Sequence, residues 1–186
     1  GVGFSQSEGI VLSGSVSQAN VFGSGRFVSV NLNTSKINRA IGLSYTNPYF
    51  TVDGISQGFD VYHRKSDPQS LDYAYKTEST GGGIRFGIPI DEKQTVNFGL
   101  AIDHTKVEID PTDSDTPYQY KRFNQEFCGN GSSDISNPAL IPSTCSNVTF
   151  PATIGWVSDS KDSAINPRSG AFQRANLEWA LPGGDL

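Results

Sequence analysis

The stretch NPYFTVDG, residues 47–54, decides the fold of this chain because it predicts a reversal of direction between two strands. Pro48 fixes its own φ and pushes Asn47 away from the helical region, while Gly54 tolerates the positive φ of a tight turn. On both sides of the stretch, apolar residues alternate with small or polar ones, a period that is typical of β-strands. The stretch therefore predicts the turn of a β-hairpin. Its two large aromatic residues, Tyr49 and Phe50, call for an apolar or interfacial surface nearby.

The same alternation continues along most of the chain and predicts an antiparallel meander of about nine strands. The expected strands lie near residues 1–4, 10–17, 28–33, 40–45, 55–65, 73–88, 95–109, 150–156 and 174–181. A triple glycine, 81–83, lies within the sixth strand, where it allows either a sharp bend or a bulky neighbour to pack closely. From residue 110 to residue 146 no period is sustained, so we expect a long loop. The turns near residues 20, 47, 91 and 162 are expected at one end of the sheet, and this loop at the other.

The composition agrees with an all-β chain. Only 35% of the residues are hydrophobic and 18% are charged, and Gly, Ser, Thr, Asn and Tyr suit strands with one apolar and one small or polar face. The net charge is -5 without any dense basic cluster, which excludes nucleic acid as a partner. No apolar run reaches the roughly 18 residues of a membrane-spanning helix, and the N-terminus lacks the pattern of a signal peptide.

The two cysteines, Cys128 and Cys145, both fall within the expected long loop. Neither belongs to a CxxC pair and no paired histidines accompany them, so a zinc site is disfavoured. A disulfide formed in an oxidising compartment is the favoured interpretation. Such a bond would tie down a loop that has no regular period.

Charged side chains fall on the face of the expected strands opposite the apolar stripe. They are Asp60, Arg64, Arg85, Asp103, Arg174 and Glu178. In a soluble β-sandwich this polar face is the wet outside, whereas in a transmembrane barrel it lines the lumen and the apolar face contacts lipid. Segments of about ten alternating residues, aromatics near the strand ends, and short turns alternating with longer loops favour the barrel over the sandwich. On this interpretation the lipid-facing residues include Leu12, Val30, Leu43, Phe98, Leu100 and Leu177.

Four stretches carry a more specific signal. In chain order they are VSQANVFGSG (16–25), LSYTNPYFTVDG (43–54), VNFGL (96–100) and DSAINPRSG (162–170). They resemble stretches that occur in this order in the barrel of the BamA family of bacterial outer-membrane protein assembly factors. The resemblance covers nearly the whole chain. It implies that residues 1–186 form the N-terminal part of a 16-stranded transmembrane β-barrel. The family's periplasmic domains, its inward Val-Arg-Gly-Phe loop and its closing strand are absent from these residues.

The resemblance also implies a function, namely folding and inserting β-barrel proteins into the outer membrane of a Gram-negative bacterium. The implied partners are unfolded barrel client proteins, accessory assembly lipoproteins, and outer-membrane lipid with lipopolysaccharide. The edge that gates the barrel or receives a client strand is implied at Gly1, Val2, Gly3 and Phe4. Periplasmic turns are implied at Asn47, Pro48, Tyr49, Phe50, Asp53 and Gly54, and at Asn166, Pro167, Arg168 and Gly170. A passive outer-membrane pore, or a soluble β-sandwich serving as a surface or adhesion module, is the alternative.

Nothing in the sequence points to catalysis, a metal or a cofactor. His63 and His104 each stand alone in a strand without a partner at ligand spacing, so a surface or lumenal position is expected for both. The carboxylates of residues 110–115 lack the glycine and the distal glutamate of a calcium loop. The Gly-Ser-Gly of residues 23–25 has no helix after it to cradle a phosphate. We therefore expect no enzyme activity and no cofactor.

Overall fold

The chain forms one antiparallel sheet in which each strand pairs with the next along the sequence. The computed structural model describes residues 1–6, 8–68, 74–131, 135–163 and 165–182. Its strands are β1 (Val2–Ser5), β2 (Gly9–Gln18), β3 (Phe27–Thr34), β4 (Asn38–Asn47), β5 (Ser56–Ser66), β6 (Tyr75–Pro89), β7 (Gln94–Ile109), β8 (Thr144–Asp159) and β9 (Phe172–Leu181). The predicted all-β meander is confirmed. The expected start of the sixth strand, Tyr73, lies outside the described residues.

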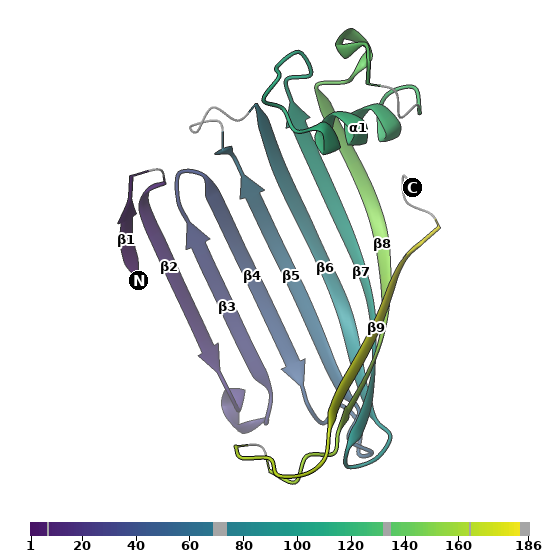
Figure 1. Ribbon diagram of the computed structural model, residues 1–186. Coiled ribbons are helices and arrows are strands. Elements are labelled where there is room, and N and C mark those ends of the chain that lie inside the picture. The colour runs from purple at the N-terminus through teal and green to yellow at the C-terminus, as the bar shows by residue number, and fades with distance from the viewer. Residues whose placement is uncertain (7, 69–73, 132–134, 164, 183–186) are drawn as a thin grey trace.

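The sheet is curved, and its strands differ greatly in length. Figure 1 shows β9 curling in front of β8, while the helix α1 (Tyr118–Phe127) lies over the strands at one end. The turns β2–β3, β4–β5, β6–β7 and β8–β9 all lie at the opposite end, as predicted. We call these the turn end and the loop end of the sheet. In the described ranges each strand is followed by the next in this one sheet and no second sheet covers it, which is the arrangement of an opened barrel wall and not of a sandwich.

The two faces of the sheet have opposite chemistry, as the alternation predicted. The register puts Val30 opposite Leu43 and Leu43 opposite Val61, and these apolar residues share one face with Leu12, Phe98, Leu100 and Leu177. Leu100 is 54% exposed and Ile102 50% exposed, so this outer face is apolar without being buried. The inner face carries Asp60, Arg85, Asp103 and Arg174. An exposed apolar belt of this kind fits a sheet whose solvent on that side is lipid.

The segment between β7 and β8 contains a helix that the sequence analysis missed. The expectation of an irregular loop over residues 110–146 is wrong in two places, because α1 occupies Tyr118–Phe127 and β8 begins at Thr144. Tyr120, Phe123 and Phe127 recur at helical spacing, and Tyr120 and Phe123 pack against a small core of Val107, Ile109 and Ile141. Val107 and Ile109 belong to the inner face of β7. The helix therefore folds over the inner face at the loop end.

The triple glycine allows a bulky neighbour to approach the sheet. The register places Gly81 between Tyr62 and Asp103, and a Cβ at Gly81 would lie 2.9 Å from the Tyr62 phenol oxygen. At Gly83 a Cβ would lie 2.9 Å from that of Ala101. Of the two roles considered for these glycines, close packing is the one that the contacts support.

Candidate functional site

The edge strand β1 is the shortest and least supported part of the sheet. It has 4 residues, whereas β7 and β8 have 16 each. Within the described part of the chain it pairs only with β2, from Val2 opposite Leu12 to Ser5 opposite Gly9. Ser13 N also donates to Gly1 O at 2.9 Å, just beyond the strand. Among the described residues, no strand pairs with the other side of Val2, Gly3 and Phe4.

Side chains add little to the pairing of β1. Val2 is 76% exposed and Phe4 82% exposed, and both lie on the outer face with Leu12 and Ile10. Between them, Gly3 lies opposite Val11 with no atom within 4 Å of the position that a Cβ would occupy. A glycine at this point has more chain entropy to lose on pairing and no side chain to pack across the strands. The sequence therefore builds an edge that is held by few interactions.

An ion-pair network on the inner face joins β4, β5 and β6. Arg85 pairs with Asp60 and donates from Nη2 to Ser44 Oγ and Thr46 Oγ1, both at 3.2 Å. A Cβ at Gly58, opposite Arg85, would lie 2.6 Å from Arg85 Nε. Gly58 thus leaves the space through which the guanidinium reaches β4. Because the charges are partly exposed, the ion pair contributes at most about 1 kcal/mol, and its main effect is to fix side chains along the wall.

A second network on the inner face centres on Tyr62. Its phenol donates to Asp103 Oδ1 at 2.6 Å across Gly81, and the Arg64 guanidinium lies 4.8 Å from the centre of its ring. Sequence reasoning placed Arg64 and Asp103 on the polar face but missed Tyr62 and Thr46. Both lie in phase with the polar residues of their strands, so the period alone could have put them on this face. Which side chains meet there depends on the register between strands, and alternation does not supply it.

The turn end has the tight geometry that residues 47–54 predicted. Gly54 has a φ of 80°, the amide of Phe50 donates to Ile55 O at 2.8 Å, and Asn47 Oδ1 accepts from Tyr49 N at 3.3 Å. These are local backbone contacts of a hairpin turn, and they leave Tyr49 and Val52 exposed. Phe22 in the β2–β3 turn and Ile165 in the β8–β9 turn are exposed as well. Apolar tips at the same end of three hairpins suit a surface in contact with a membrane interface or with protein.

The β8–β9 turn is organised by one carboxylate. Asp162 Oδ1 accepts from the amides of Arg168 and Ser169 at 2.9 and 3.2 Å, and these hydrogen bonds lower the pKa of Asp162 below its usual value. Gly170 has a φ of 93°, and a Cβ there would collide with the backbone of Ser160 and Lys161. The predicted turn residues Asn166, Pro167, Arg168 and Gly170 lie in this turn. Their assignment to the periplasm stays a prediction.

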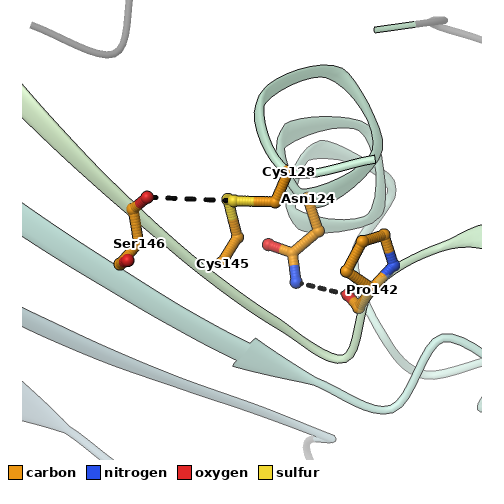
Figure 2. Close-up of a disulfide and its surroundings, with 5 residues drawn as sticks. All are labelled: Asn124, Cys128, Pro142, Cys145 and Ser146. Carbon is orange, nitrogen blue, oxygen red and sulfur yellow. Dashed lines mark hydrogen bonds between the residues drawn. A yellow bond between two sulfur atoms is a disulfide. The ribbon is translucent and has the colours of Figure 1, made fainter. Parts of the chain in front are cut away.

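The predicted disulfide is confirmed at the loop end. Figure 2 shows it joining Cys128, just after α1, to Cys145 in β8, with Cα atoms 5.6 Å apart. Beside it, Asn124 Nδ2 donates to Pro142 O at 2.8 Å. Cys128 Sγ also lies 3.8 Å from Ser146 O, a contact without a proton because the sulfur is in a disulfide. The bond therefore fastens the helix over the inner face of the sheet.

The isolated histidines lie on the outer face near the loop end. His63 Nδ1 lies 2.7 Å from Thr80 Oγ1, and His104 is opposite Thr80 on the other side. Among the described residues, no group of three or more His, Cys, Asp and Glu side chains could hold a metal ion. In the same part of the chain, no helix is both long enough and apolar enough to cross a membrane.

Comparisons with known proteins show the family to which the chain belongs. Residues 20–186 match the Omp85 superfamily domain. The chain is 36% identical over 187 residues to the outer membrane protein assembly factor BamA of Neisseria meningitidis serogroup B, covering 99% of this chain and 22% of that protein. It is 29% identical to BamA of Nitratidesulfovibrio vulgaris, over 96% of this chain and 19% of the relative. It therefore spans about a fifth of the length of these relatives.

A solved structure supports the same architecture. The crystal structure of BamA from Haemophilus ducreyi lacking POTRA domains 1–3 is similar, with a TM-score of 0.69 and 24% sequence identity. The similarity covers 99% of this chain and 34% of that one. At this level of identity the match supports the fold, namely a wall of strands like part of that protein.

Proposed function

The chain belongs to the Omp85 superfamily, and on that premise we propose that it is the N-terminal part of the barrel of a machine that inserts β-barrel proteins into the outer membrane of a Gram-negative bacterium. The observation that carries the proposal is the weakly held β1 edge, next to a sheet whose outer face is an exposed apolar belt. In this proposal residues 1–186 are one portion of a larger closed barrel. Periplasmic domains and the remaining strands belong to the rest of the protein.

The proposed mechanism uses the backbone of β1. In the complete barrel this strand meets the last strand at a seam, and few side-chain contacts oppose the opening of that seam. Once open, the edge presents N–H and C=O groups that must find partners in lipid, because there is no water to satisfy them. An incoming client strand can supply those partners by adding to the sheet through main-chain hydrogen bonds. Backbone pairing is largely blind to side chains, so one edge could serve many clients.

The remaining sites support this role. The networks around Arg85 and Tyr62 brace β4 to β7 on the inner face, so opening would be confined to the edge. The disulfide-held helix covers the inner face at the loop end, an arrangement that favours a machine over a passive open pore. The exposed apolar tips at the turn end would lie at the periplasmic boundary, where accessory lipoproteins and unfolded clients approach. Because strand addition makes no covalent change, the proposal requires no catalytic residue and no cofactor.

The test is site-specific crosslinking in the complete protein. Cysteine replaces Val2, a second cysteine is placed in the final strand of a client stalled during assembly, and oxidation is followed by gel electrophoresis. We expect a disulfide between Val2→Cys and the client. A matched variant carries cysteine at Val16, in the interior of β2 on the same outer face, and should give none. Crosslinks that form only with the machine's own last strand would mean that β1 is a permanent seam.

A further inference from the structure

The two cysteines of the disulfide lie in different surroundings (Figure 2). Cys145 is an inner-face residue of β8, opposite Val107, and is 1% exposed. Cys128 directly follows α1 and is an exposed residue. A thiol in solution attacks a disulfide at a sulfur that it can reach, and the other sulfur leaves. The folded chain therefore offers Cys128, and not Cys145, to such a thiol.

The helix that this bond fastens is partly polar on its buried side. Asn124 and Gln125 of α1 are buried, and so is Asn147, two residues along β8 from Cys145. Among the described residues, Asn124 Oδ1, Gln125 Oε1 and both polar atoms of the Asn147 side chain have no hydrogen-bond partner within the protein. Buried polar groups without a partner cost free energy. These amides therefore contribute less to the attachment of α1 than apolar side chains would in their place.

The apolar contacts between α1 and the sheet form a small core. Val107, Ile109 and Ile141 are its buried members, and Tyr120 and Phe123 of the helix pack against them. A helix of 10 residues is marginal in water without tertiary contacts. This helix has no side-chain hydrogen bond at its N-cap residue and no basic residue in its last turn to complement the helix dipole. Its position over the inner face therefore depends strongly on the disulfide.

We propose that Cys128 is a site of thiol–disulfide exchange, and that exchange there releases α1 from the inner face. The thiolate of a small external dithiol attacks Cys128 Sγ, the bond to Cys145 Sγ breaks, and Cys145 leaves as a thiolate that takes up a proton. The second thiolate of the reagent then attacks its own sulfur in the mixed disulfide, and Cys128 leaves in turn. Two electrons pass to the protein, and the dithiol becomes a cyclic disulfide. The inference goes beyond the proposed function, because it uses no part of β1.

Release of α1 uncovers one defined part of the inner face. Val107 and Ile109 of β7 and Asn147 of β8 become accessible at the loop end, while the pairing of β7 with β8, from Gln94 to Glu108, does not include the bond. The sheet therefore keeps its shape when the helix leaves. Access to the interior from the loop end then depends on the concentration of thiols on that side.

The simplest alternative is a permanent structural bond. In that case an external thiol reacts at neither sulfur of the folded protein, and the apolar core holds α1 in place even when the bond is absent. The two explanations therefore differ both in the sulfur that reacts and in what happens to the helix afterwards. Each difference is measured by its own experiment.

The first experiment identifies the sulfur that is attacked. The complete protein, with any cysteine outside residues 1–186 replaced by serine, is reconstituted in nanodiscs and treated briefly with glutathione. Free thiols are then blocked with N-ethylmaleimide in denaturant, and chymotrypsin separates the two cysteines by cutting after Phe127 and Leu140. Mass spectrometry should find at least about tenfold more glutathione on Cys128 than on Cys145. In protein that is denatured before the treatment, the preference should disappear.

The second experiment measures release of the helix. Trypsin cuts after Lys121 and Arg122, both within α1, only when the helix has left its folded position. Reduction with dithiothreitol should speed this cleavage about tenfold or more, because proteolysis follows the population of the open form. The matched control is Cys128→Ser with Cys145→Ser, which should be cut at the faster rate whether or not dithiothreitol is present.

A further variant tests the buried amides. Asn147→Leu replaces an unpaired amide by an apolar side chain and should slow the cleavage of the reduced protein. Asn97→Leu, on the inner face of β7 opposite Gly155, makes the same change near the turn end and should leave the cleavage rate as it is. Equal rates in these two variants would contradict the part assigned to the amides.

The proposal has two points at which it can fail. Glutathione in equal amounts on the two cysteines, mainly on Cys145, or on neither in the folded protein would overturn exchange at Cys128. Fully reduced protein, verified by its mass, whose α1 is cut no faster than that of the oxidised protein would overturn the release. Crosslinking of clients to Val2→Cys is independent of both results, so the proposed function is judged separately.

Discussion

The first hairpin and the centre of the sheet differ in how firmly they are held. β1 has 4 residues and two exposed apolar side chains, with a glycine between them. The centre has strands of up to 16 residues, side-chain networks that cross three strands, and a helix fastened by a disulfide. Both belong to one continuous sheet. The comparison teaches that the sheet has few stabilising contacts at its first edge and many at its centre, a difference that the proposed addition of client strands to β1 requires.

The largest effect is expected from a charge in the centre of the apolar belt. Leu100→Arg puts a guanidinium on the outer face of β7 and should destabilise the folded barrel by about 2 to 4 kcal/mol if the position is near the midplane. Ala101→Arg, one residue along on the inner face, should be tolerated much better because the side chain reaches the lumen. Denaturant titration of the complete protein in lipid vesicles measures both. Equal cost at the two positions would remove the distinction between the faces.

Removing the disulfide should loosen the helix α1 and the loops beside it without loosening the sheet. In the chain-entropy account, a bond that closes a loop of this length stabilises the folded state by about 3 kcal/mol. Cys128→Ser with Cys145→Ser is therefore expected to increase proteolysis and amide exchange in residues 110–143 while leaving β4 to β7 protected. Unchanged protection of α1 would show that its packing on Val107, Ile109 and Ile141 is sufficient alone. Exchange mass spectrometry with and without a reductant provides the comparison.

Strengthening β1 should reduce the difference in stability between the first edge and the centre of the sheet. Gly3→Val adds a β-branched side chain opposite Val11 where no atom lies within 4 Å of the new Cβ. The change should stabilise the edge by about 0.5 to 1 kcal/mol and lower the yield of client crosslinks to Val2→Cys. Gly14→Ala, in the interior of β2 with similar free space, is the control. A crosslink yield that is the same in both variants would contradict the idea that a weak edge is needed.

The smallest effect concerns the β8–β9 turn and pH. Because hydrogen bonds from Arg168 N and Ser169 N lower the pKa of Asp162, the carboxylate is favoured in the folded turn. Its stabilising contribution is complete above the unfolded pKa of about 3.9 and is lost as pH falls through the lower folded value. We expect no change between pH 8 and pH 5, and a loosened turn in strong acid. The loosening of the turn can be followed through the NMR resonances of the amides of residues 168 and 169. Asp162→Asn should abolish the acid transition.

Much of the fold could be read from local patterns, because a strand repeats every two residues and a hairpin turn needs particular backbone angles. Those rules were sufficient for the nine strands apart from the start of β8 at Thr144, for the two faces and for the turn at residues 47–54. They also gave the end of the sheet to which each connection belongs, since strands of a meander alternate in direction. The pairing of Cys128 with Cys145 followed from there being two cysteines, without any knowledge of geometry.

The helix α1 was missed because its signal is short and weak. Only three aromatic residues mark its apolar side, the segment is otherwise polar, and it has no side-chain cap at its start. A ten-residue helix of this kind is marginal in water without tertiary packing. Its stability comes from Val107, Ile109 and Ile141 and from the disulfide, which are contacts that local sequence does not contain.

By itself, the sequence determined which residues form strands, which side of each strand is apolar, and where the chain turns, because each of these follows from neighbours within a few positions. Only the tertiary structure decided that Arg85 meets Ser44 and Thr46, that Tyr62 packs over Gly81 onto Asp103, and that Arg39, Lys65, Glu78 and Lys106 form one row. The physical reason is register. Alternation fixes the face on which a side chain lies, but its neighbours on the next strand depend on how far the two strands are shifted along each other. That shift is set by turn geometry and packing over the whole sheet.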